Sequence, residues 1–493
     1  MPKLFSQLPH QSNDVLFRAA DVTLTFAQAQ KACQQLSETL AQLHGQSVAL
    51  KLDNSLPWLL CDLALSATTK VAIPLPAFFS DEQVAHAIQQ SGASWLLADN
   101  EIQDKQATKT LNVCGEVLHL YEMEDAGPVE YFPNTQKVTF TSGSTGTPKG
   151  VCLSWQNQLQ VAKSLAQVIT LSQPKHLCLL PLAVLLENIA GVYAPLLRGG
   201  CVEVVALSEL GFTGSQLSHP NKLLNAITAA QPNSLIVVPE LLRFLCQAVG
   251  TGWLPPSSLK FIAVGGAKVD VSLLHRAAKL GLPVFQGYGL SEVGSVVALN
   301  TAGQDGNVGQ PLPHIEYRVV DSELYLRGNN FLGYLGDKAM APEQWLATGD
   351  RVSVTENGLR IEGRVKNLII NSFGRNIAPE WPESVLLSHG EVLQCMVVGE
   401  GQPYLSALLY VAASMSAADI EQLLESVNAT LPDYAHIKSY IRLNQPFSLE
   451  NGLLTANGRI KRQAILHHYQ SAIAALYGTQ QALPLQPESF LHI

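Results

Sequence analysis

The sequence predicts an α/β protein with a large N-terminal domain of layered sheets and helices and a small C-terminal α+β domain. Short apolar runs alternate with amphipathic stretches along most of the chain, and near residue 315 they give way to short strands of alternating polarity. The chain has 493 residues, of which 47% are hydrophobic and 14% charged, so it can bury more than one core.

The expected secondary structure follows from the spacing of the apolar residues. Because parallel strands need a long crossover connection, strands that alternate with helices favour mainly parallel sheets. Strands are expected at 47–53, 70–75 and 94–99, with further apolar runs at 176–182, 201–206, 234–239 and 260–266. Helices are expected at 56–68, 81–91, 416–429 and 461–477.

The domain boundary is expected between Gly363 and Lys366, where a segment rich in charge and glycine begins. The sequence thus divides into a large domain at 1–363, a small domain at 364–478 and an extended, proline-containing tail at 479–493.

Composition excludes several classes of protein. The net charge of −9 and the absence of a basic stripe argue against nucleic-acid binding. The eight cysteines are scattered without zinc spacing, so reduced thiols are expected. No signal peptide and no apolar run of membrane-spanning length are found, so a cytoplasmic protein is expected, with peripheral contact to a membrane left open.

An anion-binding loop is expected at 141–150, after an apolar strand that begins near residue 137. Glycines let backbone N–H groups approach an anion, hydroxyls add donors, and one lysine adds a positive charge. The proline before the lysine excludes a Walker A loop, while a flexible surface turn stays open on composition alone. The loop residues are Thr141, Ser142, Gly143, Ser144, Thr145, Gly146, Thr147, Pro148, Lys149 and Gly150.

This loop resembles the phosphate loop of the adenylate-forming superfamily, which includes acyl-CoA synthetases, luciferases and nonribosomal adenylation domains. The resemblance covers residues 12–465 and implies the acyl-CoA synthetase-like version of the predicted fold. It also implies that Thr141 to Lys149 hold the phosphates of ATP, and that Thr145 and Glu292 hold Mg²⁺.

The segment FQGYGLSEVG at 285–294 resembles the family's second nucleotide motif. Tyr288 offers a flat aromatic face to a base, Ser291 a hydroxyl to a phosphate, and Glu292 a hard oxygen ligand to Mg²⁺. A solvated carboxylate at a helix start is the alternative for Glu292. The glycines Gly287 and Gly289 belong to this segment, and Gly265, Gly266 and Ala267 resemble the glycine turn beside the adenine, with Gly265 also at the acyl pocket.

Two further motifs point to the nucleoside and to a hinge. Asp350, in TGD, is suited to accept hydrogen bonds from ribose hydroxyls, although a turn-forming aspartate would look the same. Arg364 would reach the ribose or phosphate, and Lys366 lies where the family pivots to make its small domain mobile. Asn367 replaces the aspartate that is common at this position in the family. Gly374 lies in the loop that, in CoA-using members, lines the tunnel for the thiol. Residues 322–336, in which Ser322 replaces a usual glycine, are interpreted as structural.

Two departures from the family pattern affect the chemistry. The family's catalytic lysine falls on Arg459, and Lys461 would share a face with Arg459 on an extended strand, so either could supply the charge. Val184 stands where a histidine or aromatic residue commonly borders the acyl site. An apolar wall there favours a fatty or other hydrophobic acid, although a buried helix start would look the same.

The resulting hypothesis is an AMP-forming acid–thiol ligase that uses ATP, Mg²⁺ and coenzyme A. The acid would become an acyl-adenylate and then pass to a thiol. Three alternatives stay open: an acyl carrier protein as acceptor, a luciferase-like oxidative half-reaction, and a nucleotide-binding protein weakened by Arg459.

Overall fold

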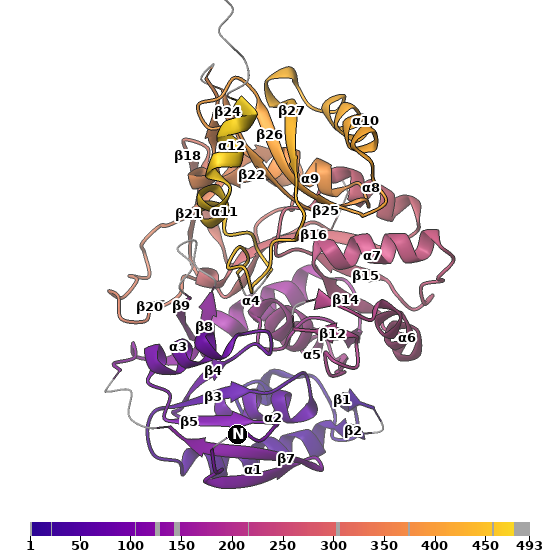
Figure 1. Ribbon diagram of the computed structural model, residues 1–493. Coiled ribbons are helices and arrows are strands. Elements are labelled where there is room, and N and C mark those ends of the chain that lie inside the picture. The colour runs from indigo at the N-terminus through magenta and orange to yellow at the C-terminus, as the bar shows by residue number, and fades with distance from the viewer. Residues whose placement is uncertain are drawn as a thin grey trace, which may run out of the picture. The chain divides into compact units, whose positions relative to one another are not determined.

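The computed structural model describes residues 2–20, 22–103, 105–123, 129–141, 148–214, 216–301, 306–372, 375–455 and 458–477. Contacts within the chain define two compact units, a large unit of residues 1–362 and a small unit of residues 363–493 (Figure 1).

One eight-stranded sheet of the large unit, called the loop sheet here, carries the expected phosphate loop. Its strand order is β20-β9-β8-β4-β3-β5-β7-β6, and β3 pairs in parallel with β4 and β5. The strands are β3 (Ser47–Lys51), β4 (Val71–Pro74), β5 (Trp95–Ala98), β6 (Lys109–Val113), β7 (Glu116–Glu122), β8 (Thr135–Thr141), β9 (Lys149–Ser154) and β20 (Gly333–Tyr334).

A second eight-stranded sheet, called the nucleotide sheet here, carries the expected adenine motifs. Its order is β17-β16-β15-β14-β10-β11-β1-β2, and β14, β15 and β16 are parallel neighbours. The strands are β1 (Val15–Ala19), β2 (Val22–Thr25), β10 (Lys175–Leu177), β11 (Cys201–Glu203), β14 (Ser234–Val237), β15 (Phe261–Val264), β16 (Val284–Leu290) and β17 (Ser295–Leu299).

Three helical elements contact strands of both sheets. Helix α2 (Leu56–Leu65) packs on β1 and β4, and α4 (Trp155–Val168) packs on β8, β9 and β17. A π-helix, η2 (Leu186–Tyr193), contacts α4, β10, β14 and β17, and its Asn188 accepts a hydrogen bond from Lys137 of β8. Every residue of α2 is buried, which explains why all of its residues except Asp62 are apolar rather than only those on one face.

Local signals explain where the other helices begin. Thr25, Ser80 and Ser154 form capping boxes at the starts of α1, α3 and α4, each accepting a hydrogen bond from a backbone N–H of the first turn. The remaining helices of the large unit are α1 (Phe26–Ala41), α3 (Asp81–Ser91), α5 (Ala194–Leu197), α6 (Pro220–Ala230), α7 (Pro239–Gly250) and α8 (Val271–Lys279), with the short turns η1 (Phe5–Gln7) and η3 (Ser291–Val293).

Smaller sheets complete the large unit. An antiparallel sheet follows the nucleotide sheet in the order β18-β19-β21-β22, and its alternating polarity matches the change expected near residue 315. Its strands are β18 (Glu316–Val320), β19 (Glu323–Arg327), β21 (Leu346–Thr355) and β22 (Gly358–Arg364), and a separate pair is formed by β12 (Phe212–Thr213) and β13 (Gln216–Leu217).

The small unit is an α+β fold around a three-stranded sheet of order β25-β26-β27, drawn in orange in Figure 1. The strands are β25 (Val392–Val398), β26 (Leu405–Val411) and β27 (Ile437–Arg442), with a short pair β23 (Ile369–Ile370) and β24 (Asn376–Ile377). The helices are α9 (Glu380–Leu387), α10 (Ala417–Asn428), α11 (Arg462–His468) and α12 (Gln470–Tyr477), with the short turns η4 (Val365–Asn367) and η5 (Asp433–Ala435).

The α/β fold class and its two-part arrangement are confirmed, with two local corrections. The apolar run 176–182 is a strand only up to Leu177; it then turns through Pro181, which lacks a backbone N–H, toward η2. The expected helix 461–477 is two helices, because Tyr469 interrupts it. All eight cysteines are free, as expected, and no helix within the described ranges is long and apolar enough to cross a membrane.

Candidate active site

The expected phosphate loop connects two antiparallel strands of the loop sheet. Strand β8 ends at Thr141 and β9 begins at Lys149, and these two residues face each other in the ladder. Gly150 follows, where an added Cβ would lie 3.0 Å from Val138 and 3.2 Å from Leu335, so the backbone is closely packed there. Residues Ser142, Gly143, Ser144, Thr145, Gly146 and Thr147 lie outside the described residues.

The structure brings Lys149 and Glu292 to one tyrosine that the sequence analysis missed. The ammonium of Lys149 lies 5.0 Å from the centroid of the Tyr334 ring, and the Tyr334 hydroxyl donates to Glu292 Oε1 at 2.7 Å. Residues 322–336 were interpreted as structural. The available signal was a tyrosine that directly follows a glycine in FLGYLG.

Glycines allow the backbone to approach closely at the ends of β15 and β16 and between β16 and β17. An added Cβ on buried Gly265 would lie 3.2 Å from the carbonyl oxygen of Gly287, and one on Gly289 would lie 1.9 Å from that of Ser295. Gly266 has φ +81, a left-handed conformation that favours glycine, and it is exposed together with Ala267. The result is a side-chain-free stretch of backbone that a flat base can approach.

Tyr288 and Asp350 come from different sheets and meet. The Tyr288 hydroxyl donates to Asp350 Oδ2 at 2.6 Å, and the backbone N–H of Asp350 donates to Thr348 Oγ1 at 3.1 Å. Asp350 is buried inside β21 rather than in a connecting turn, and the positive φ of Gly349 marks a local irregularity of that strand. The base-facing and ribose-facing candidates are therefore neighbours.

Ser291 and Glu292 lie in the short turn η3, directly after β16. Both residues are half-buried, so the alternative of a fully solvated carboxylate does not describe Glu292. Its Oε1 atom accepts from a neutral hydroxyl, which does not cancel the carboxylate charge, and a carboxylate offers a second oxygen. The arrangement fits a hard divalent cation bound through one carboxylate.

Val184 lies just before the π-helix η2, half-buried, and its carbonyl accepts from the Asn188 N–H at 3.0 Å. Glu187 joins the start of η2 to β10, because His176 Nε2 lies 2.8 Å from Glu187 Oε1. Gly191 makes room for this pair, since a Cβ there would lie 2.2 Å from Glu187 Oε1. Val184 is thus at a buried helix start.

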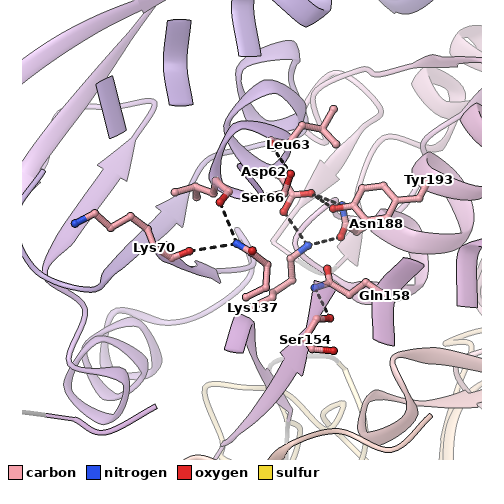
Figure 2. Close-up of polar contacts among 11 residues, drawn as sticks. Asp62, Leu63, Ser66, Lys70, Lys137, Ser154, Gln158, Asn188 and Tyr193 are labelled. Carbon is pink, nitrogen blue, oxygen red and sulfur yellow. Dashed lines mark hydrogen bonds and ion pairs between the residues drawn. The ribbon is translucent and has the colours of Figure 1, made fainter. Parts of the chain in front are cut away.

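A second buried cluster joins η2 to the loop sheet, and Figure 2 shows how its side chains converge. Lys137 Nζ lies 2.7 Å from Asp62 Oδ1 and donates to Asn188 Oδ1 at 2.6 Å. Asn188 Nδ2 and the Tyr193 hydroxyl donate to Asp62 Oδ2 at 3.0 Å and 2.5 Å. Burial and the adjacent Asp62 carboxylate raise the pKa of Tyr193 well above its usual value, so the phenol stays protonated and donates. The sequence analysis missed this cluster.

The small unit holds the remaining predicted residues of the hinge. Arg364 is exposed at the end of β22, and Lys366 is exposed in η4. Asn367 Nδ2 donates to Glu380 Oε1 at 2.6 Å. An aspartate at 367 would place a second negative charge against Glu380, which gives a physical reason for this departure from the family. Gly374 lies outside the described residues.

Arg459 and Lys461 lie on either side of Ile460, which forms an isolated antiparallel bridge with Leu454. The Thr455 N–H donates to the Arg459 carbonyl at 2.7 Å, the Arg459 N–H donates to Thr455 Oγ1 at 3.1 Å, and the Lys461 N–H donates to the Leu453 carbonyl at 2.8 Å. Lys461 directly precedes α11. The pairing of Ile460 with Leu454 agrees with the expectation that the two residues, two positions apart in an extended segment, share a face, with the side chain of Arg459 exposed and that of Lys461 half-buried.

Comparisons with known proteins agree with this geometry. The model of the AMP-binding enzyme family matches residues 5–335, and that of its C-terminal domain matches residues 366–481. The chain belongs to the AMP-binding enzyme family.

Relatives of this AMP-binding enzyme include ligases for different acids. A long-chain-fatty-acid–CoA ligase of Mycobacterium bovis is 25% identical, with 88% of each chain covered. A 2-succinylbenzoate–CoA ligase of Salmonella typhimurium is 30% identical, covering 66% of this chain and 68% of the relative. A solved structure of an O-succinylbenzoate CoA synthetase of Bacillus subtilis, in complex with ATP and a magnesium ion, shows the same fold with a TM-score of 0.73 at 22% identity. The match covers 93% of this chain and 98% of the synthetase.

These findings confirm the expected enzyme class for the AMP-binding enzyme described here, an AMP-forming acid–thiol ligase that acts through an adenylate. Enzymes of this class use ATP, Mg²⁺ and CoA. The relatives act on both fatty and aromatic acids, so the expectation of a fatty acid is not established by them.

Proposed function

We propose that the protein activates a hydrophobic carboxylic acid and transfers it to CoA. The carboxylate oxygen attacks the α-phosphorus of ATP, the bond to the pyrophosphate oxygen breaks, and acyl-AMP and pyrophosphate form. The thiol of CoA then attacks the acyl carbonyl, AMP leaves with the bonding electron pair, and the thiol loses its proton. Such steps depend on positioning and on charge neutralisation more than on covalent help from the protein.

The observation that carries the ATP half of the proposal is the pair of contacts Lys149–Tyr334–Glu292 and Tyr288–Asp350. Thr141 to Lys149 would hold the β- and γ-phosphates, and Glu292, with Thr145, would hold Mg²⁺. Bound Mg²⁺ offsets charge on the phosphates. Tyr288, Asp350 and Arg364 would hold the nucleoside.

The character of the acid is inferred from the segment around Val184. Leu186 and Ala190, spaced four residues apart in η2, are partly buried against both large apolar cores of the large unit, and so is Ala263 of β15. Gly265 lies two residues after Ala263 and presents backbone without a side chain. Together with Val184 they would form an apolar wall, which favours a hydrophobic acid over a charged one.

The small unit is proposed to supply the second positive charge. Arg459 is exposed, and a guanidinium binds phosphate and carboxylate oxygens in a bidentate manner. The small unit would reorient about Lys366 between the two half-reactions, bringing the thiol after adenylation.

The deciding experiment measures pyrophosphate release from ATP with a panel of fatty, aromatic and dicarboxylic acids. Release with hydrophobic acids and none with small polar ones supports the proposal, and adding CoA should yield the thioester and AMP. No release with any acid would refute the adenylation step. Formation of acyl-AMP that CoA does not consume, but a phosphopantetheinylated carrier protein does, would replace CoA by that carrier.

The assignment of the catalytic charge is tested by Arg459→Ala and Lys461→Ala. We expect Arg459→Ala to slow adenylation and Lys461→Ala to have a smaller effect, because Arg459 is the more exposed side chain. The opposite ranking would assign the role to Lys461. ATP binding without any turnover in the wild-type chain would instead favour a nucleotide-binding protein, the candidate suggested by arginine at position 459.

A further inference from the structure

We infer that Tyr334 is a positioning residue of the nucleotide site: it holds Lys149 and Glu292 apart and fixes the carboxylate that would receive the divalent cation. This inference rests on the proposed function, because it deepens the roles of Lys149 and Glu292 in binding Mg·ATP. It assigns a task to a segment whose sequence pattern alone indicated only a structural role.

Backbone hydrogen bonds place Tyr334 between the two residues. Strand β20 pairs with β9, with Tyr334 opposite Val151, and the Leu335 N–H donates to the Gly150 carbonyl at 2.8 Å. On its other side, the Phe331 N–H donates to the Glu292 carbonyl at 2.7 Å. The segment is therefore attached both to the strand that leaves the phosphate loop and to the turn that carries the carboxylate.

The tyrosine ring is held in place from two directions. Gly333 has φ +145, and a Cβ there would lie 2.7 Å from the Phe132 ring, so only glycine allows the chain to pass. The Phe331 ring packs edge-on against Tyr334, with centroids 4.8 Å apart and planes at 71°. These contacts restrict where the hydroxyl and the ring face can point.

The two contacts of Tyr334 use different parts of the side chain. The hydroxyl donates to Glu292 Oε1 at 2.7 Å, a hydrogen bond to a charged acceptor that orients the carboxylate without neutralising it. The ring lies under the Lys149 ammonium at 5.0 Å, within cation–π range. Among the described residues, no ion pair joins Lys149 to Glu292. Tyr334 keeps these opposite charges from neutralising each other, so the lysine stays available for phosphate and the carboxylate for metal.

The test separates the hydroxyl from the ring. Tyr334→Phe removes only the hydroxyl, and Tyr334→Leu removes both contacts. Tyr317→Phe is the matched control, because Tyr317 is exposed on β18. Equilibrium binding of ATP is measured by calorimetry with and without Mg²⁺, after the melting temperature of each variant has shown that it is folded.

We expect Tyr334→Phe to weaken Mg·ATP binding about tenfold, the effect of one hydrogen bond to a charged group, and to leave metal-free ATP binding unchanged. The Mg²⁺ concentration for half-maximal pyrophosphate release should rise by a similar factor, with the KM of the acid unchanged. Tyr334→Leu should weaken metal-free ATP binding as well, because Lys149 is then free to pair with Glu292. Wild-type Mg·ATP affinity in folded Tyr334→Phe would overturn the inference.

Glu292→Gln distinguishes failure of this inference from failure of the proposed function. If Glu292→Gln weakens Mg·ATP binding, adding Tyr334→Phe to that variant should cause little further loss. If Glu292→Gln weakens it and Tyr334→Phe does not, only the positioning role fails. If Glu292→Gln binds Mg·ATP as the wild type does, the metal role in the proposed function fails, and the positioning role fails with it.

Discussion

Replacing Lys137 by methionine should lower the free energy of unfolding of the large unit by about 3–5 kcal/mol, the cost of leaving one partner of a buried ion pair uncompensated. The range applies because Lys137 and Asp62 are only 2% and 3% exposed and their charged atoms lie 2.7 Å apart. Methionine keeps most of the length and the apolar stem of lysine. The change therefore removes charge and hydrogen bonds more than packing.

A second substitution shows whether the loss comes from stranded charge. Asp62→Asn added to Lys137→Met removes the negative charge, and the amide oxygen at position 62 can still accept from Asn188 and Tyr193, as Asp62 Oδ2 does. We expect the double variant to be about 2 kcal/mol more stable than Lys137→Met alone. A double-mutant cycle measures this coupling directly.

Urea unfolding followed by tryptophan fluorescence suits this test, because two tryptophans lie beside the cluster. Trp58 is buried in α2 with Asp62, and the Trp155 ring is 5.7 Å from the Tyr193 ring. Their emission therefore reports on unfolding of this part of the large unit.

The matched control is Lys51→Met, which breaks an exposed Lys51–Asp81 contact of 3.9 Å in the same unit. Exposed pairs contribute about 0–1 kcal/mol, so this variant should unfold near the wild-type urea concentration. If Lys137→Met unfolds at the same concentration as Lys51→Met, or if the double variant is no more stable than Lys137→Met, the reasoning about buried charge is wrong.

Three further outcomes are expected. Ser322→Gly should raise the melting temperature and stabilise the fold by up to about 1 kcal/mol, because Ser322 has φ +66; a lower melting temperature would contradict this. Burial lowers the pKa of His314 to about 4, so the unfolded chain takes up the proton first as the pH falls. The stability that comes from the neutral imidazole is therefore lost between about pH 6.5 and 4. His314→Gln should reduce that loss when unfolding is measured at pH 7 and at pH 5, and an unchanged pH dependence would argue against this reasoning. Arg462→Met should lower the free energy of unfolding of the small unit by about 3–5 kcal/mol, because Arg462 pairs with buried Glu383. Arg459→Ala should change that free energy by less than about 0.5 kcal/mol in the same denaturation assay, because the residue is on the surface. Equal effects of the two substitutions would contradict this prediction.

Much of the fold could be predicted because the signals are local. Strands β3, β4 and β5 and helices α2 and α3 lie within the expected ranges, since hydrophobic spacing and caps such as Ser80 act over a few residues. The nucleotide motifs were recognisable for a related reason: a turn that needs glycine, such as the one at Gly266, shows that need in the sequence. The resemblance of these motifs, taken together, to the adenylate-forming superfamily was sufficient to predict an ATP-using acid–thiol ligase.

The sequence by itself therefore determined the fold class, the nucleotide motifs and the family. Only the tertiary structure decided which side chains meet: Tyr334 between Lys149 and Glu292, and Asp62 with Lys137 from a helix and a strand far apart in the chain. Such contacts depend on sheet order and on close packing of distant elements, which hydrophobic periodicity does not encode.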